Sequence, residues 1–367
     1  MIYYWILFLI PALFALYEDK RSLNPRTGSY PIKFNLGLFL WMIFLTIMIG
    51  LRFGVGGDWL SYDTMYNEQV GLQFSEMLLS LRDDPLYNFL NWLSAQLGLG
   101  LQTVNLICAF IFSSGLVIFC QNLPRPWLGL LVAVPYLIIV VSMGYTRQSM
   151  ALGIAFFALI ALSRQKILFF TLLIMLAILA HKSAILLLPI AGLAATKNRW
   201  AVIAYLFAVG VFSYFIFIEA SIEFYLEGYI NQDLQSQGAL IRLSMNGLPA
   251  IIYFLFRKKI NLPEREGRLW FWISVLSIFM LVVFPVFPSS SALDRIALYM
   301  LPLQIVIFTY IADAIFQTKS FNTMVRYSII IFYALVQFVW LFYASNSISW
   351  LPYRSYLWVN TIAGITF

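Results

Sequence analysis

Residues 167–195 read ILFFTLLIMLAILAHKSAILLLPIAGLAA, two apolar runs separated by three polar residues. The polar residues are His181, Lys182 and Ser183, and His181 is the only histidine of the chain. Ionisable groups at membrane depth are costly to bury, so each one is a candidate functional residue. A hydrogen-bonded histidine at the membrane interface is the simpler alternative for His181. Whether other ionisable groups share its position decides between the two.

Composition places the chain among membrane proteins. Hydrophobic residues make up 62% of the sequence, charged residues only 11%, and the mean hydropathy is +0.85. Such a chain has too few polar residues to cover a water-soluble globule, and its apolar runs repeatedly approach the length of a bilayer span. We therefore predict an all-α, polytopic transmembrane helical bundle that forms one integral membrane domain over residues 1–367. The net charge of +7 is explained by basic cytoplasmic loops, so no nucleic-acid partner is expected.

The apolar runs predict about 12 segments, two of them too short for ordinary spans of roughly 20 residues. The short pair is 167–180 and 183–195, which indicates either tilted helices or a broken, re-entrant pair with His181 at the turn. The first run lacks a basic start and a cleavage site, so we interpret it as a retained span rather than a signal peptide. The predicted segments are 2–17, 34–51, 101–119, 127–143, 147–162, 167–180, 183–195, 200–218, 239–256, 269–286, 292–313 and 325–343.

Two longer connections remain between these segments. Residues 52–100 form an outer loop in which 85–99, apolar on one side only, predicts an interfacial helix. Residues 219–238 form a second outer loop, which carries Glu219, Glu223, Glu227 and Asp233.

Lysine and arginine residues fix the orientation. If 85–99 does not cross and 167–195 crosses twice, every basic cluster lies on one side, which is cytoplasmic by the positive-inside rule. Both termini and the two acidic loops then lie outside. The basic clusters are Lys20, Arg21, Arg26 and Lys33; Arg125; Arg164 and Lys166; Lys197 and Arg199; Arg257 to Arg268; and Lys319 and Arg326.

A few cations lie at the outer ends of segments, contrary to this rule. Each alone is explained by snorkelling or by an acidic neighbour, but together with His181 they form a set on the disfavoured side. Guanidinium groups suit a diphosphate, because each planar fork donates two charge-assisted hydrogen bonds to phosphate oxygens. The set consists of Arg52, Arg147, Arg242 and Arg295.

No metal site, disulfide or cofactor is predicted. The outer carboxylates match no recognised metal-binding loop and are interpreted as solvated. Cys108 and Cys120 lie about 18 Å apart on one helix, too far for a disulfide. Residues 54–57, which read GVGG, lack the lysine and strand of a phosphate-binding loop and predict a flexible hinge beside Asp58.

Three stretches resemble the signature motifs of the EpsG family of Wzy-like polysaccharide polymerases. They are LRFGVGGDWLSY at 51–62, TRQSMA at 146–151 and AHKSA at 180–184, in the family's order and spacing. Trp59 stands where the family usually has tyrosine, and Arg295 to Tyr299 weakly resembles a family Arg-x-x-x-Tyr pattern. The resemblance covers most of the chain up to about residue 200.

The resemblance implies a fold similar to GT-C glycosyltransferases in the bacterial inner membrane. The implied reaction is polymerisation of undecaprenyl-diphosphate-linked oligosaccharide repeat units at the periplasmic face, with a chain-length regulator and a flippase as partners. Arginines in a poorly hydrated site can stabilise the leaving diphosphate without a metal ion. His181 is the candidate base, and Asp58 competes with it.

Each candidate site residue has a predicted role. Arg52, Arg147 and Arg295 bind diphosphate by motif match, and Arg242 joins them from topology alone. The residues predicted to position sugar are Tyr62, Gln148, Tyr299 and, as an alternative to its role as base, Asp58.

Other functions stay open at this point. An O-antigen ligase uses a similar lipid-linked donor with a different acceptor. A lipid-linked oligosaccharide flippase or transporter would place charges along the span interiors and often shows repeated halves, which this chain lacks. A membrane O-acyltransferase explains the histidine but gives the arginines no use.

Overall fold

The computed structural model describes residues 1–22, 30, 33–79, 84–195, 200–201, 203–205, 207–209, 211, 238–260, 262, 264–287, 290–315 and 319–358. The described chain is all-helical, and its single β-bridge joins Arg52 to Ser355. The all-helical part of the predicted fold class is thus confirmed, and the likeness to GT-C glycosyltransferases stays a prediction. The second outer loop lies outside the described residues apart from Gly238, as do most of segment 200–218 and Arg26, Lys197 and Arg199.

Within the described residues, 6 helices are long and apolar enough to cross a membrane. These candidate spans are Leu101–Gln121, Thr146–Ser163, Ala239–Phe256, Glu266–Val286, Leu293–Ile311 and Ser320–Tyr343. Shorter apolar helices cover Ile2–Tyr17, Leu36–Gly50, Pro126–Ser142, Ile167–Ala180 and Lys182–Ala194. The chain is therefore a multi-pass membrane protein, and the count of about 12 segments stays a prediction.

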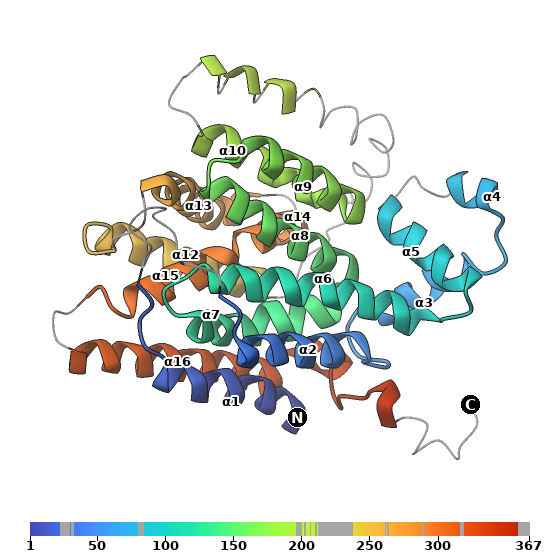
Figure 1. Ribbon diagram of the computed structural model, residues 1–367, viewed down its shortest axis with the longest axis horizontal. Coiled ribbons are helices and arrows are strands. Elements are labelled where there is room, and N and C mark those ends of the chain that lie inside the picture. Colours follow the sequence, from blue (N-terminus) through green and yellow to red (C-terminus); the bar gives the residue numbers. More distant parts are fainter. Residues whose placement is uncertain are drawn as a thin grey trace.

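The spanning helices lie roughly side by side, so that their ends form two opposite faces of the bundle (Figure 1). In chain order the first elements are α1 (Ile2–Tyr17), α2 (Leu36–Gly50), α6 (Leu101–Gln121), α7 (Pro126–Ala133), the π-helical η1 (Val134–Ser142), α8 (Thr146–Ser163) and α9 (Ile167–Ala180). After them come η2 (Lys182–Leu187), α10 (Leu188–Ala195), α12 (Ala239–Phe256), α13 (Glu264–Val283), η4 (Phe284–Val286), α14 (Ser290–Ala297), η5 (Leu298–Met300), α15 (Pro302–Ile311), α16 (Lys319–Tyr343) and η6 (Ser345–Ser349).

Helices α6 and α8 form the centre of the bundle. They cross at Gly115 and Gly153, where a Cβ built on Gly115 would lie 2.1 Å from the Gly153 carbonyl oxygen. Small residues at such a crossing let two apolar helices pack backbone to backbone, as is typical of membrane bundles. The crossing places the first residues of α8 beside the outer loop.

The apolar stretch 167–195 is broken at His181. Helix α9 ends at Ala180, His181 is extended with φ −161° and ψ 121°, and the chain continues as η2 and α10. The structure thus supports the broken pair with His181 at the turn.

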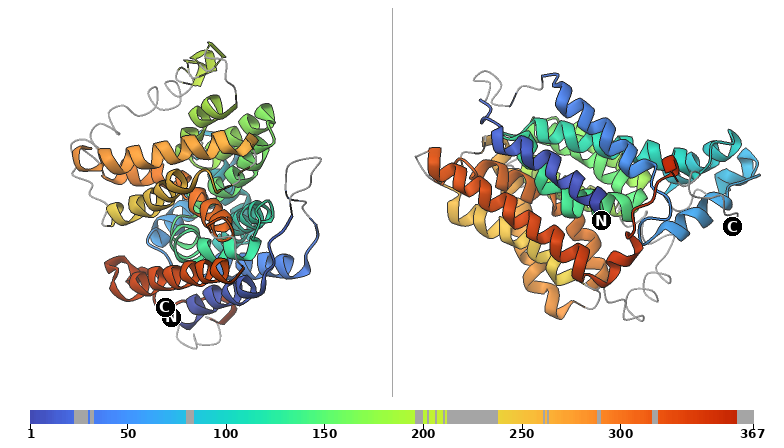
Figure 2. Two further views of the ribbon diagram at one scale, coloured as in Figure 1. Left: turned by 90° about the vertical axis from the view of Figure 1, so that its left-hand side faces the viewer. Right: turned by 90° about the horizontal axis from the view of Figure 1, so that it is seen from below.

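The predicted outer loop, residues 52–100, carries three short helices, α3 (Trp59–Asn67), α4 (Phe74–Leu79) and α5 (Pro85–Gln96). They project beyond the spanning helices at one end of the bundle (Figures 1 and 2). Helix α5 confirms a helix in the predicted stretch 85–99.

The segment that follows α16 braces the start of this loop. Phe53 N–H donates to the Arg354 carbonyl at 3.0 Å, Tyr356 N–H donates to Leu51 at 2.9 Å, and Gly56 N–H donates to Ser349 at 2.9 Å. Gly56 has φ +112°, and a Cβ on it would lie 2.2 Å from the Met143 carbonyl oxygen. Gly56 therefore allows a close backbone approach two residues before Asp58, where the sequence predicted a flexible hinge.

Candidate active site

One buried carboxylate, that of Asp84, organises the end of the bundle. Its Oδ2 lies 2.8 Å from Arg147 Nη1 and 3.0 Å from His181 Nδ1, and its Oδ1 accepts the Lys182 N–H at 3.1 Å. Burial alone would raise the pKa of this carboxyl, but the hydrogen bond and charge of His181 and the charge of Arg147 outweigh burial. The pKa of Asp84 therefore lies below its ordinary value of 3.8, and the group is a carboxylate at neutral pH.

In the sequence Asp84 is only one of several acidic residues of the predicted outer loop, and no motif singles it out. Asp84 precedes Pro85 at the start of α5 and adopts a left-handed backbone conformation, with φ 48° and ψ 60°. Aspartate tolerates this conformation better than most residues, and here its side chain does not cap its own helix. The one available signal was an aspartate before a proline at a helix start, a position that places the side chain at the helix end.

Asp84 holds two partly exposed side chains, those of Arg147 and His181. The exposed fraction of the side chain is 25% for Arg147, 15% for His181 and 5% for Asp84. A carboxylate facing Nδ1 favours a hydrogen on that nitrogen, which leaves the lone pair of Nε2 for another partner. In that tautomer Nε2 of His181 can accept a proton, and the same carboxylate holds the guanidinium of Arg147 beside the ring.

Arg147 stands on an aromatic support. Its guanidinium carbon lies 5.8 Å from the ring centroid of Tyr62, which is 2% exposed and contacts Tyr87 edge to face. The structure therefore places Tyr62 under Arg147, and this cation–π contact limits the movement of the guanidinium. Gln148, the next residue of α8, is buried.

Asp58 lies in the field of the same cluster. Burial raises the pKa of its carboxyl above the ordinary value of 3.8. The charges of Arg147, Arg295 and His181 lower the pKa by less. Arg295, an exposed residue in the last turn of α14, therefore lies within electrostatic reach of Asp58, one of the two candidate bases.

Arg52 is brought to this end of the bundle but faces inward. It is 1% exposed, and its guanidinium donates to the carbonyls of Ile49 at 2.6 Å and Val55 at 3.2 Å and to Thr146 Oγ1 at 2.6 Å. The contact with Thr146 ties the glycine loop to the start of α8, directly before Arg147. Contact between Arg52 and a diphosphate would require these buried hydrogen bonds to break.

The remaining candidates lie at the side of the cluster that faces α14. Arg242, in the first turn of α12, forms an ion pair with Asp294, the residue before Arg295. Tyr299 is 1% exposed, and its hydroxyl lies 3.1 Å from Ser183 Oγ, two residues after His181. Tyr299 thus contacts the chain directly after His181.

Among the described residues no three His, Cys, Asp or Glu side chains are grouped so that they could hold a metal ion. The two cysteines, Cys108 and Cys120, are buried and free.

Fold and site together define a multi-pass membrane protein with a cation-rich cluster at one end of its helices. Residues 35–355 match the family model described as EpsG family, so the chain belongs to the EpsG family. Membership indicates a glycosyltransferase-like polymerase of polysaccharide biosynthesis, which acts on lipid-linked oligosaccharide. Searches of curated proteins and of solved structures return no match.

Proposed function

We propose that the protein polymerises undecaprenyl-diphosphate-linked oligosaccharide repeat units at the periplasmic face of the bacterial inner membrane, without a metal ion. The observation that carries this proposal is the contact of Asp84 with both His181 and Arg147 at one end of the bundle, the end that the positive-inside rule predicts to face outward. Glycosyl transfer from a diphosphate needs a base for the attacking hydroxyl and a cation for the leaving diphosphate. A histidine and a guanidinium side by side match these two needs.

In this reaction a sugar hydroxyl of one repeat unit attacks the anomeric carbon of the sugar on another lipid diphosphate. A new glycosidic bond forms, the bond from the anomeric carbon to the diphosphate oxygen breaks, and its electron pair leaves with the lipid diphosphate. The hydroxyl proton passes to His181 Nε2. The Asp84 carboxylate stabilises the imidazolium that results, as the orienting carboxylate does in other acid–base pairs.

Asp58 is the second candidate for the proton. Its raised pKa makes it a better base than an ordinary aspartate, and the glycine loop places it near the charges of Arg147 and His181. His181 is the better supported of the two, because the Asp84 carboxylate faces its Nδ1 and can stabilise the imidazolium that proton transfer to Nε2 creates.

The leaving diphosphate gains negative charge, which preorganised cations stabilise without reorganisation of solvent. We assign this role to Arg147, Arg295 and Arg242. Arg147 keeps 25% of its side chain exposed while it binds Asp84, and Arg295 is exposed on α14. Arg52 is assigned a positioning role, because its hydrogen bonds hold the glycine loop against α8. Tyr62 and Tyr299 support Arg147 and the His181 turn, respectively.

Loss of surface polysaccharide ladders in cells tests the proposal. His181→Ala and Arg147→Ala should abolish the chain-length ladder while the protein is still expressed and inserted. Arg164→Ala is the matched control, because Arg164 follows the opposite end of α8, is exposed, and donates to Asn122 Oδ1 at 2.7 Å. Normal ladders in the two site variants would falsify the site assignment.

Cysteine labelling tests the orientation. Ser183→Cys introduces a partly exposed thiol beside the site, whereas the native Cys108 and Cys120 are buried. A membrane-impermeant thiol reagent added from the periplasm should label this variant. Labelling from the cytoplasm alone would reverse the proposed topology.

A further inference from the structure

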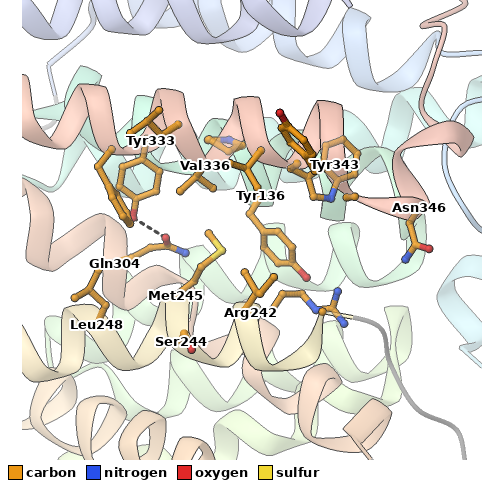
Figure 3. Close-up of a pocket in the computed structure, with 18 of the residues that line it drawn as sticks. Tyr136, Arg242, Ser244, Met245, Leu248, Gln304, Tyr333, Val336, Tyr343 and Asn346 are labelled. Carbon is orange, nitrogen blue, oxygen red and sulfur yellow. Dashed lines mark hydrogen bonds between the residues drawn. The ribbon is translucent and has the colours of Figure 1, made fainter.

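An elongated cavity lies between α12 and α16, beside the site described above (Figure 3). Its volume is about 870 Å³, near the upper end of the range for ligand pockets. The lining is mostly apolar and includes Met245, Leu248, Phe332, Val336 and Val339. The cavity can therefore hold a long apolar chain.

The cavity is a groove that opens on the side of the bundle, where the lipids of the bilayer lie. Leu335 and Val339 line it and are 55% and 52% exposed, so it is accessible from the side of the bundle. It follows α16 from Phe332 to Tyr343, about 16 Å at 1.5 Å per residue, roughly half the thickness of the hydrocarbon core. A chain in the groove would thus run through one leaflet.

The two ends of the groove differ. Gln304 and Tyr333 close the inner end, where the Tyr333 hydroxyl donates to Gln304 Oε1 at 2.7 Å. Arg242 lies at the other end, and Figure 3 shows the hydroxyl end of Tyr136 directed toward its guanidinium. An apolar groove with a cation at its outer end complements a lipid with an anionic head.

The cationic end of the groove adjoins the candidate active site. Arg242 pairs with Asp294, and the neighbouring Arg295 lies within the electrostatic reach of Asp58. A lipid whose tail occupies the groove would therefore have its head beside the base and the arginines.

We propose that this groove binds the isoprenoid tail of the donor, the lipid diphosphate whose sugar is transferred. This inference rests on the proposed function. Of the two lipid-linked substrates, only the donor has its diphosphate at the reacting carbon. The diphosphate of the acceptor is separated from the reacting hydroxyl by the repeat unit itself, so the tail nearest the site belongs to the donor.

Filling the groove tests this assignment. Val336→Trp places an indole among the lining residues, and Ile331→Trp places one on the same helix at a lipid-exposed position outside the groove. Affinity for undecaprenyl diphosphate, measured on the purified full chain in nanodiscs, should fall about tenfold or more for Val336→Trp, because losing contact with even two methylene groups has that effect. Ile331→Trp should bind as the unaltered protein does.

Cross-linking provides a measurement that does not depend on a bulky substitution. A photoreactive amino acid at Val339 should cross-link to undecaprenyl diphosphate, and added unlabelled undecaprenyl diphosphate should compete. The same group at Ile331 should not give this product. Cross-linking at Val339 to phospholipid alone, or unchanged affinity of Val336→Trp, would overturn the groove assignment.

The polymer assay separates the two proposals. If the unaltered protein polymerises lipid-linked repeat units while Val336→Trp binds and polymerises equally well, the groove inference fails and the proposed function stands. If the unaltered protein makes no polymer, the proposed function itself fails.

Discussion

Replacement of Asp84 by asparagine probes the site most sharply, because the two side chains have nearly the same shape. The asparagine oxygen can keep the hydrogen bond from Lys182 N–H. Its amide nitrogen then faces His181 and Arg147, where the carboxylate Oδ2 accepted from both. An amide donates to Nδ1 and so moves the histidine hydrogen to Nε2, which can no longer take the proton of a sugar hydroxyl.

The size of the effect follows from these contacts. Loss of a correctly oriented general base lowers the rate by about 10²–10⁴-fold. Removing one partner of a buried ion pair costs about 3–5 kcal/mol, and the partial exposure of Arg147 reduces that cost, so the variant should still fold.

The assay is the initial rate of polymer formation by purified protein, with thermal unfolding measured in parallel. Asp63→Asn is the matched control, since Asp63 lies exposed on α3 and the charge change is identical. A rate for Asp84→Asn within about twofold of the control, in folded protein, refutes the proposed orientation of His181.

Three further outcomes are expected. Arg147→Lys keeps the charge but loses the planar fork, so polymer formation should fall at least about tenfold while Arg164→Lys leaves it unchanged; equal rates would exclude a guanidinium-specific contact. Gly54 has φ +62° and open space around it, so Gly54→Ala should cost roughly 1–2 kcal/mol of stability. Gly56→Ala should cost clearly more, because the added Cβ meets the Met143 carbonyl oxygen. Equal melting temperatures of the two variants in detergent would contradict the close packing of this loop. At the opposite end of the bundle, burial raises the pKa of Glu18 from 4.5 to about 7, although the N–H groups of Trp127 and Leu128 donate to it. The folded protein then holds this proton more tightly than the unfolded chain, so stability falls as pH rises from about 4.5 to about 7; Glu18→Gln should flatten this part of the melting-temperature profile, and an unchanged profile would refute the assignment.

Much of the fold was predictable because hydropathy reports directly on membrane spans. The runs at 101–119, 147–162 and 239–256 correspond closely to α6, α8 and α12. The break at His181 was visible as a polar interruption of two short apolar runs. The bracing of the glycine loop by residues 349–356 was not predictable, because it depends on backbone hydrogen bonds between segments about 300 residues apart.

The site was predictable in outline and not in its organisation. The positive-inside rule singled out cations on the outer side, and the structure brings Arg147, Arg295 and His181 near Asp58. Nothing in the sequence distinguished Arg52, which turns inward, from Arg147, which stays partly exposed. Asp84 was hidden among other loop carboxylates because its role depends on a left-handed turn that pattern alone does not reveal.

The most direct test is a reaction with purified protein and labelled undecaprenyl-diphosphate-linked repeat units in the presence of a chelator. The unaltered protein should release one undecaprenyl diphosphate for each new glycosidic bond and build long chains, and His181→Ala should do neither. Failure of the unaltered protein to extend any chain, or chain growth by His181→Ala at the normal rate, would contradict the central claim.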